Sequence, residues 1–418
     1  MPKVCVLGLG YIGLPTASVL ATNGFDVVGV DVAEHVLNTV AGGHIHIEEP
    51  GLATLVHAAI HSGKLRTAPE PEPADVHFLA VPTPLTSGKT ADMAYVRGAA
   101  EAIVPHLRPG ALVVLESTSP PGTCRDLVRP ILEQSGLQVG PDLHLAYCPE
   151  RVLPGKILHE LIQNDRIIGG YDRESAEKAR EVYARFVEGE LFLTDATTAE
   201  MVKLLENTYR DVNIALANEA ARICEGLGVD FWEVSRYASR HPRVHIHSAG
   251  PGVGGHCISV DPWFLVEKAP EEARLIRTAR QTNDAMPRYV VQVLKDLLAA
   301  VAEPKVALLG LAYKGNVDDL RESPSLRVAE LLEQEGIRFA AHDPLVKNAP
   351  MELQPIETCL DGADCLLLLT GHDVYREVAP EDAVRRMRTP VLFDTRNTLD
   401  HAAWTRAGFR VRILGAGG

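Results

Sequence analysis

The stretch KVCVLGLGYIG (residues 3–13) decides the fold of the first part of the chain. Its apolar run is typical of a buried strand, and glycines at positions 8, 10 and 13 follow it in the spacing G-x-G-x-x-G. In a dinucleotide-binding fold, Gly8 allows the tight turn, Gly10 lets a pyrophosphate approach the backbone, and Gly13 lets the next helix pack on the strand. Asp31 ends the second strand 18 residues after Gly13, where a carboxylate accepts both ribose hydroxyls and repels a 2′-phosphate. The pattern therefore predicts NAD rather than NADP.

The first third of the chain alternates short apolar strands with helical patterns, which is typical of an α/β fold with a doubly wound parallel sheet. The strands are expected at residues 4–7, 27–30, 76–81, 112–115 and 143–147. Residues 198–286 are mostly helical in pattern, broken by a Gly- and His-rich loop, and the α/β alternation returns from residue 305.

That return is a degenerate internal repeat. KVALLGLA (305–312) matches KVCVLGLG (3–10), and each is followed by a strand that ends in an acid, Asp31 or Asp343. We therefore predict two Rossmann-like domains, at 1–190 and 301–418, joined by a central helical region at 191–300, with a site in the cleft between the two domains. The second copy is expected to have lost the turn glycines, which predicts a different ligand there.

Composition limits the class of protein. The chain has 418 residues, of which 46% are hydrophobic and 23% charged, an ordinary globular mix. No apolar run approaches the roughly 20 residues of a membrane span. Because the sequence runs directly into a strand, we expect no signal peptide. The net charge of −14 argues against nucleic-acid binding, and seven cysteines without C-x-x-C spacing fit a reducing compartment. We expect a cytoplasmic protein.

Two loops that follow strands carry threonines. VPTP (81–84) and ESTSP (116–120) stand where strand ends face the cofactor crevice of such sheets. Thr83 and Thr118 are therefore predicted to contact the cofactor or a water molecule. The alternative is a pair of simple proline-rich turns.

A polar stripe lies on the expected helix after residue 198. Lys203, Asn207 and Arg210 are spaced i, i+4 and i+7, which places an amine, an amide and a guanidinium on one helix face. Inside a cleft, desolvation would let Lys203 lose its proton and act as a base. A solvated helix face is the alternative interpretation.

A loop of glycines and histidines ends in a cysteine. In GPGVGGHC (250–257), four glycines within six residues deliver His256 and Cys257 at its end. The histidine and cysteine spacings match no zinc pattern, so we expect no metal. A buried structural cysteine remains an alternative, but the flanking glycines and the nearby Asp261 favour an exposed, functional thiol.

With these motifs in place, the chain resembles the UDP-glucose/GDP-mannose dehydrogenase family over essentially its whole length. Within the family it is most similar to the bacterial branch that oxidises UDP-N-acetyl-D-mannosamine. The matching segments are GLGYIGLPTA (8–17), HIHIEEP (44–50), CPERVLPG (148–155), AEMVK (199–203), RHPRV (240–244), GPGVGGHC (250–257), VDPWF (260–264), ND (283–284) with Pro287, and DDLRESP (318–324).

The resemblance implies a role for each matching residue. Cys257 would be the nucleophile, Lys203 the proton acceptor and Asn207 the oxyanion donor, while Asp261 and Thr118 would place the hydrolytic water. NAD would be contacted by Gly8, Gly10, Tyr11, Ile12, Gly13, Asp31, Thr83, Thr118 and Arg321. The UDP-sugar would be lined by Arg151, Val152, Lys203, Asn207, Arg210, His241, Arg243, Gly254, Tyr313, Lys314 and Arg396. A homodimer through the central helices is also implied, with Arg243 reaching the neighbouring site.

The implied reaction is a four-electron oxidation of the C6 alcohol to UDP-N-acetyl-D-mannosaminuronate. A thiol retains the aldehyde between two hydride transfers, as a thiohemiacetal and then a thioester. One position departs from the family: UDP-glucose enzymes carry a second Glu four residues after the acid of the Pro-Glu pair, where this chain has Pro154. Glu150 remains a catalytic candidate, and the group that activates water is left open.

Three other functions remain open from the sequence. The sugar could be UDP-N-acetylglucosamine or UDP-glucose, because the pocket shape that selects it is hardly readable. A two-electron hydroxyacid-type dehydrogenase shares the domain plan but needs no Cys257. A non-catalytic NAD-binding regulator would not need Lys203, Asn207, Cys257 and Asp261 together.

Overall fold

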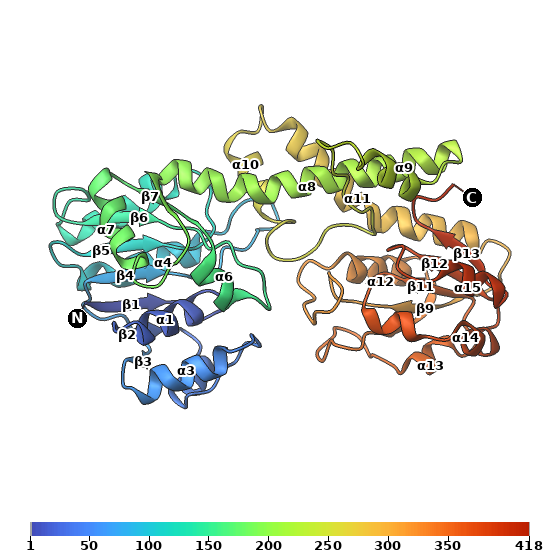
Figure 1. Cartoon of the computed structure of the whole chain (residues 1–418), viewed down its shortest axis with the longest axis horizontal. Coiled ribbons are helices and arrows are strands. Elements are labelled where there is room, and N and C mark those ends of the chain that lie inside the picture. The colour runs from blue at the N-terminus through green and yellow to red at the C-terminus, as the bar shows by residue number, and fades with distance from the viewer. Residues whose placement is uncertain (1, 418) are drawn as a thin grey trace. The chain divides into compact units, whose positions relative to one another are not determined.

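The computed structural model of the chain describes residues 2–417, and their contacts divide the chain into two compact units. The first unit comprises Met1–Glu206 and Trp263–Ala269, and the second comprises Asn207–Pro262 and Pro270–Gly418. The division falls inside the long helix α8 (Ala196–Leu227). Each unit is built around one β-sheet (Figure 1).

The sheet of the first unit has the strand order β3-β2-β1-β4-β5-β6-β7-β8. It is parallel except where β7 runs antiparallel to β6. All five strands that the sequence predicted are present, and β3, β7 and β8 are additional. The bounds are β1 (Lys3–Leu7), β2 (Asp26–Val30), β3 (Leu65–Ala68), β4 (Val76–Leu79), β5 (Leu112–Leu115), β6 (His144–Tyr147), β7 (Arg166–Gly170) and β8 (Leu191–Asp195).

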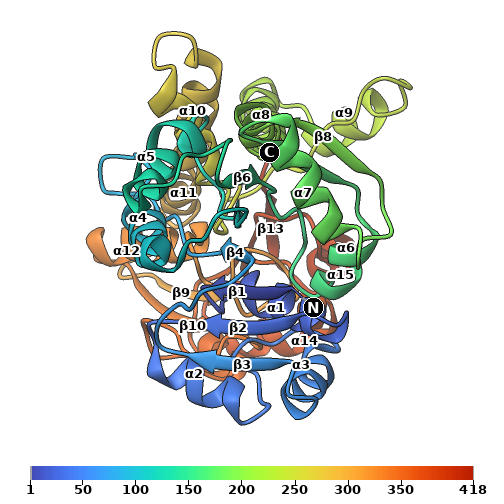
Figure 2. The same ribbon diagram turned by 90° about the vertical axis from the view of Figure 1, so that its left-hand side faces the viewer.

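Helices cover both faces of this sheet (Figure 2). Side chains alternate along β1, so that Val4 and Val6 pack with one helical layer while Cys5 and Leu7 pack with the other. The first layer holds α1 (Gly13–Thr22), α2 (Glu34–Ala41), α3 (Leu52–His61), α6 (Ile157–Gln163) and α7 (Arg173–Tyr183), and the second holds α4 (Ala94–Ile103), the π-helix η2 (Cys124–Val128) and α5 (Arg129–Leu132). Two short 3₁₀ turns, η1 (Val104–His106) and η3 (Glu133–Ser135), complete the layer of α4 and α5.

The sheet of the second unit is smaller and wholly parallel, in the order β10-β9-β11-β12-β13. One face packs on α11 (Arg274–Leu297) and α12 (Pro324–Gln334). The other face packs on three short helices and a 3₁₀ turn. The bounds are β9 (Lys305–Leu309), β10 (Arg338–His342), β11 (Cys365–Leu368), β12 (Val391–Asp394), β13 (Arg410–Ile413), α13 (Ile356–Leu360), η4 (Asp373–Glu377), α14 (Pro380–Arg386) and α15 (His401–Arg406).

The predicted internal repeat is confirmed, with one correction. β9 and β10 pair in parallel as β1 and β2 do, so two sheets of the doubly wound type are present. The expectation that the second copy had lost the turn glycines is wrong for Gly310. This residue takes a φ of +88°, matching the +90° of Gly8, because the chain must leave the sheet through the same left-handed turn in both copies.

The middle of the chain is helical, as predicted. It consists of α8, α9 (Phe231–Ala238), α10 (Asp261–Lys268) and α11, with the glycine-rich loop between α9 and α10. Met286, Val290 and Leu294 of α11 belong to the core of the second sheet. The domain limits at 190 and 300 stay a prediction. Within residues 2–417, no helix combines the length and apolar character that crossing a membrane requires.

Candidate functional site

The turn after β1 is shaped by its glycines. A Cβ added at Gly8 would lie 2.6 Å from the carbonyl oxygen of Ala80, and one at Gly13 would lie 1.8 Å from that of Gly8. A Cβ at Gly10 would meet no described atom within 4 Å. Gly8 and Gly13 are therefore required by packing, whereas Gly10 faces open space, as the predicted approach of a pyrophosphate requires.

Asp31 lies at the end of β2, beside this turn. Its Oδ2 accepts a hydrogen bond from the backbone N–H of Leu9 at 2.9 Å, and its Oδ1 accepts one from Ala33 at 2.9 Å. The residue is only half-buried. The strand order reverses direction at the neighbouring strands β1 and β4, and in such sheets the ligand crevice lies at this reversal.

The other predicted cofactor residues of the first unit lie on the same edge of the sheet. Thr83 is buried in the loop after β4, and Thr118 is half-buried in the loop after β5. Tyr11 is 40% exposed, and Ile12 directly precedes α1. The residues present therefore fit a dinucleotide: a turn open at Gly10, an accessible carboxylate and two hydroxyls.

Lys203 is buried near the middle of the first unit's part of α8. Its Nζ donates to the backbone carbonyl of Glu150 at 2.8 Å. The Glu150 carboxylate points elsewhere, because Oε2 lies 2.8 Å from Nη2 of Arg166, with both side chains buried. Its Oε1 accepts the backbone N–H of Arg151 at 2.8 Å. The carboxylate of Glu150 is thus engaged in a buried ion pair, while its carbonyl holds the lysine.

A second buried carboxylate adjoins this ion pair. Glu116 accepts the phenolic O–H of Tyr183 at 2.7 Å and a longer contact from Thr16 at 3.4 Å. Burial, and then the charge of Glu150, raise the pKa of Glu116 to about 7, against the opposing charge of Arg166. Neither Glu116, in the loop ESTSP (116–120), nor Arg166, beside an apolar run, carries a local sequence signal that its charged side chain is buried.

The segment with Arg151 and Val152 forms the loop between β6 and α6. Arg151 pairs with Glu206 at 2.7 Å and also donates to the carbonyl of Asp165. Val152 packs against the core. Glu49, from the segment HIHIEEP, fixes the far end of this loop by accepting the N–H groups of Gly155 and Ile157 at 2.7 and 2.8 Å.

The polar stripe on α8 is not uniform. Lys203 is buried, Asn207 is half-buried and Arg210 is exposed. In the second unit, Asn207 donates through Nδ2 to Oδ2 of Asp261 at 2.6 Å, and Asp261 is itself buried at the start of α10. An amide donor and a carboxylate are therefore in direct contact, and the roles of oxyanion donor and water-placing acid stay predictions.

Cys257 differs from the other cysteines. It is exposed, whereas the remaining six are buried, and burial raises the pKa of Cys5, Cys148 and Cys359 to about 11. The carbonyl of Cys257 accepts the backbone N–H of Asp261 at 2.9 Å, so the thiol stands one turn before α10. The alternative of a buried structural cysteine is therefore wrong, because the loop delivers this thiol to the surface.

The glycine-rich loop is packed against the segment 313–322. A Cβ at Gly254 would lie 2.5 Å from the carbonyl oxygen of Glu322, and Gly255 donates its N–H to the carbonyl of Arg321 at 2.9 Å. His241 and Arg243, at the start of the loop, are exposed. Among residues 2–417, no three His, Cys, Asp or Glu side chains are placed to hold a metal ion.

The remaining candidates belong to the second unit. Tyr313 is half-buried beside Gly255, and Lys314 is exposed. Arg321 pairs with Asp319 at 2.6 Å. Arg396 approaches Gly250 and donates from Nε to the carbonyl of Leu369 at 2.7 Å, and burial lowers the pKa of Arg396 to about 10.

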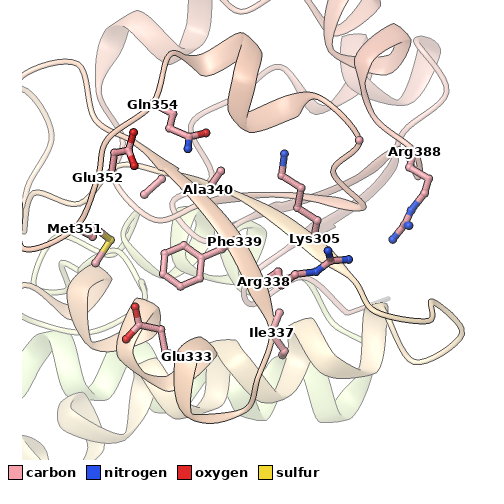
Figure 3. A pocket seen from close by; sticks show the side chains of 12 residues that line it. Lys305, Glu333, Ile337, Arg338, Phe339, Ala340, Met351, Glu352, Gln354 and Arg388 are labelled. Carbon is pink, nitrogen blue, oxygen red and sulfur yellow. The ribbon is translucent and has the colours of Figure 1, made fainter.

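A cavity of about 740 Å³ opens along the edge strand β10 (Figure 3). Phe339 points into it, with Lys305, Arg338 and Arg388 on one side and Glu333 and Glu352 on the other. It contains none of the predicted site residues.

The structure thus brings the predicted residues together in sets within each unit. The first unit gathers the glycine turn, Asp31, the two threonines and Lys203 with Glu150. The second gathers Asn207 with Asp261, the Cys257 loop with Gly254 and Tyr313, and Arg396 with Gly250. The roles of these residues stay predictions.

Comparison with known proteins gives a consistent result. Models of the UDP-glucose/GDP-mannose dehydrogenase family match at residues 2–187 (NAD binding domain), 197–285 (central domain) and 307–401 (UDP binding domain). A UDP-N-acetyl-D-mannosamine dehydrogenase of Methanococcus maripaludis is 48% identical, over 99% of this chain and 97% of the relative. An NDP-N-acetyl-D-galactosaminuronic acid dehydrogenase of Ralstonia nicotianae is also 48% identical, over 94% and 95%. The solved structure of a UDP-D-ManNAc dehydrogenase from Pyrococcus horikoshii matches with a TM-score of 0.93 at 41% identity, over 99% of each chain.

Proposed function

This chain belongs to the UDP-glucose/GDP-mannose dehydrogenase family, and from that premise we propose that it oxidises the C6 alcohol of UDP-N-acetyl-D-mannosamine to a carboxylate. The observation that carries the proposal is the exposed Cys257, set at the end of a glycine loop while the other six cysteines are buried. A two-electron dehydrogenase has no use for such a thiol. The 48% identity to a UDP-N-acetyl-D-mannosamine dehydrogenase supports this sugar.

The turn at Gly8, Gly10 and Gly13, with Asp31, Thr83 and Thr118, would hold the NAD that the family's first domain binds. NAD would supply the hydride acceptor for both oxidations, and two NAD molecules would be consumed per sugar because each accepts one hydride. Lys203 takes the hydroxyl proton in the first oxidation. Cys257 then adds to the aldehyde, and the thiohemiacetal is oxidised to a thioester that water hydrolyses, returning the thiol and releasing the carboxylate.

The contacts support separate roles for the two acids. The Glu150 carboxylate is tied to Arg166, so we assign Glu150 the task of holding Lys203 through its carbonyl. Asp261 lies against Asn207, which suits it to place the hydrolytic water with Thr118. Arg151, Val152, Arg210, His241, Arg243, Gly254, Tyr313, Lys314 and Arg396 are assigned to the UDP-sugar, and Arg321 to the phosphates of NAD.

A homodimer in the cytoplasm completes the proposal. Helix α8 exposes a series of large apolar side chains that a partner helix could cover; these are Met201, Leu205, Tyr209, Leu216, Ile223 and Leu227. Arg243 would then reach the substrate of the neighbouring subunit. We keep the division into 1–190, 191–300 and 301–418 as the functional division of the chain.

The test is a count of NADH formed per sugar consumed, with UDP-N-acetyl-D-mannosamine, UDP-N-acetylgalactosamine, UDP-N-acetylglucosamine and UDP-glucose. Two NADH per sugar, with the first of these preferred, is the expected result. One NADH per sugar would mean a two-electron enzyme, and none would mean a binding protein. Cys257→Ala should lower turnover roughly 10⁴-fold or more while NAD binding is retained.

UDP-N-acetylgalactosamine is included in the assay for a separate reason. The Ralstonia nicotianae protein, named for an NDP-N-acetyl-D-galactosaminuronic acid, is as similar in identity as the mannosamine enzyme. Preference for that sugar would move the assignment within the family and leave the chemistry of Cys257 unchanged.

A further inference from the structure

A chain of buried polar side chains runs through the second unit, outside the residues assigned to the reaction. It begins at an ion pair between α11 and α8, where Nη1 of Arg280 donates to Oδ1 of Asp211 at 2.6 Å. Asn283 donates through Nδ2 to the same Oδ1 at 2.8 Å and to the carbonyl of Asp211 at 3.0 Å. All three side chains are at most 1% exposed.

The series of hydrogen-bonded polar side chains continues to the glycine-rich loop. Asn218 donates through Nδ2 to Oδ1 of Asn283 at 2.9 Å, and its own Oδ1 accepts the backbone N–H of Gly250 at 2.9 Å. Asn218 is fully buried. Gly250 is the first residue of GPGVGGHC, which ends at Cys257.

The direction of every hydrogen bond in this series of side chains is fixed by the carboxylate of Asp211 at one end. The Asp211 carboxylate and carbonyl can only accept, so the amide of Asn283 must turn its nitrogen toward them and its oxygen toward Asn218. Asn218 must then present its nitrogen to Asn283, which leaves its oxygen for the N–H of Gly250. An aspartate or a smaller residue at position 218 breaks this sequence of donors and acceptors.

The loop is also held by close packing beside the same helix. Gly252 has a φ of +136°, and a Cβ there would lie 3.3 Å from the carbonyl oxygen of Asn283 and 2.9 Å from Cβ of Pro324. At the other end, Gly255 is bonded to the carbonyl of Arg321. The loop is therefore anchored at Gly250 by the amide chain and at Gly255 by the segment 313–322.

We infer that Asn218 and Asn283 are positioning residues that fix the Cys257 loop so that the thiol captures the aldehyde before it escapes. The inference rests on the proposed function. Because these amides hold the loop that carries Cys257, and Lys203 takes no part in their hydrogen bonds, the first oxidation should be less affected than the capture of its product.

The experiment uses the full-length enzyme with NAD and UDP-N-acetyl-D-mannosamine, and measures NADH, sugar acid and semicarbazide-trapped aldehyde together. In Asn218→Ala, formation of the acid should fall roughly a hundredfold, since small misplacements of a reacting group have effects of this order. Trapped aldehyde should appear with one NADH each. Asn213→Ala is the matched control, because its amide donates to the carbonyl of Tyr209 within α8 itself.

Two further variants separate positioning from stability. Val290→Ala removes a buried apolar group of α11 and should lower the melting temperature while keeping two NADH per acid. Asn218→Asp should regain capture as the pH is lowered, because only a protonated carboxyl can donate to Asn283 while accepting from Gly250. The inference is overturned if Asn218→Ala slows both oxidations equally and releases no aldehyde. It is also overturned if Asn218→Asp slows both oxidations equally and capture does not recover at low pH.

Hydrogen exchange of the peptide 249–257 tests the anchor without a substrate. The loop amides should exchange faster in Asn218→Ala than in Val290→Ala, and equal rates would contradict the inference. If the wild-type protein oxidises no nucleotide sugar, the proposed function fails, while this exchange measurement still decides whether Asn218 holds the loop.

Discussion

The turn after β1 in the first sheet and the turn after β9 in the second have the same backbone, but the acid beside each turn has different hydrogen-bond partners. Gly8 and Gly310 have nearly equal φ values, +90° and +88°. Gly8 donates its N–H to the carbonyl of Val30, and Gly310 donates to that of His342, both at 2.8 Å. The backbone of the turn is thus repeated in hydrogen-bond detail.

The acid beside the turn shows the difference. Asp31 accepts N–H groups from Leu9 and Ala33. Asp343 makes the equivalent bonds to the N–H groups of Leu311 and Leu345. Its carboxylate also accepts three further bonds, from the N–H groups of Ala312 and Val346 and from Nε2 of His372 at 3.1 Å.

The two carboxylates therefore have different capacities for a ligand. Asp31 is half-buried, and its carboxylate has lone pairs left to accept hydrogen bonds from ribose hydroxyls. Asp343 is 6% exposed, and its carboxylate already accepts hydrogen bonds from five donors of the protein itself. Ala312 also stands where the first copy has Gly10. We therefore expect the first turn, whose acid is left open, to hold the cofactor, and the second turn, whose acid is occupied, to be a structural element.

The most direct test of this difference gives the first turn the residue that the second turn has at the equivalent position. Gly10→Ala should leave the fold intact, because a Cβ there meets no described atom within 4 Å. It should raise the KM for NAD roughly a hundredfold, since the methyl group occupies the space of the pyrophosphate. The reciprocal Ala312→Gly is the control and should leave the KM for NAD unchanged. Equal KM values for Gly10→Ala and wild type would remove the distinction between the turns.

Removing the closed acid should affect stability instead of cofactor binding. Burial alone would raise the pKa of Asp343, but hydrogen bonds from His372 and from the backbone at Leu345, Leu311 and Ala312 hold it well below its ordinary value. Asp343→Asn should lower the free energy of unfolding by about 2 kcal/mol near neutral pH. The wild-type advantage exists above the ordinary pKa of an aspartate and is lost as the pH falls through the depressed value.

Urea unfolding of both proteins at neutral pH and near pH 3 measures this advantage. The difference between Asp343→Asn and wild type should shrink toward the lower pH. A difference that grows on acidification would contradict the role assigned to the buried carboxylate.

The open acid should affect selectivity. Asp31→Ala removes a hydroxyl acceptor and a charge that repels a 2′-phosphate, so the ratio of kcat/KM for NAD over NADP should fall by roughly tenfold or more. Asp343→Ala serves as the matched change in the second sheet and should leave that ratio as it is. Initial-rate measurements with both cofactors decide; an unchanged ratio in Asp31→Ala removes this residue from the cofactor site.

The smallest expected effect concerns the pH dependence of the free energy of unfolding, and it arises at a position where the two sheets carry different residues. Glu116 follows β5 in the first sheet, and Thr395 follows β12 in the second. Because burial raises the pKa of Glu116 to about 7, its contribution to stability is complete below about pH 4.5 and is lost as the pH rises through 7. Glu116→Gln should therefore flatten the wild-type decline in unfolding free energy between pH 5 and 8, a change on the order of 1 kcal/mol. Parallel pH curves for the two proteins would show that Glu116 is ionised throughout.

The parts of the fold that were predictable are those encoded locally. The five strands are recognisable because short, mostly apolar runs are typical of buried parallel strands, and the glycine turn is recognisable because Gly8 directly follows the first of these runs. Strands β3, β7 and β8 were missed. In β7, Gly169 and Gly170 weaken the apolar pattern, and the antiparallel pairing of β7 with β6 is decided by distant residues. The cysteine loop was found because glycines and a lone Cys257 stand together in sequence.

What the sequence by itself determined is which chemical groups the protein has in each turn and loop: three glycines and an acid after β1, a lysine and an amide one helical turn apart, and a thiol after a glycine run. Only the tertiary structure decided which of these groups remain available. Asp31 and Asp343 end similar strands, yet one is open and the other closed, because the imidazole of His372 and the amide of Val346 reach only the second. Glu150 was predicted to be catalytic, but its carboxylate is bound by Arg166, 16 residues further along the chain. Hydrogen-bond acceptors are consumed by whatever donors the fold brings near, and a sequence pattern does not contain those distances.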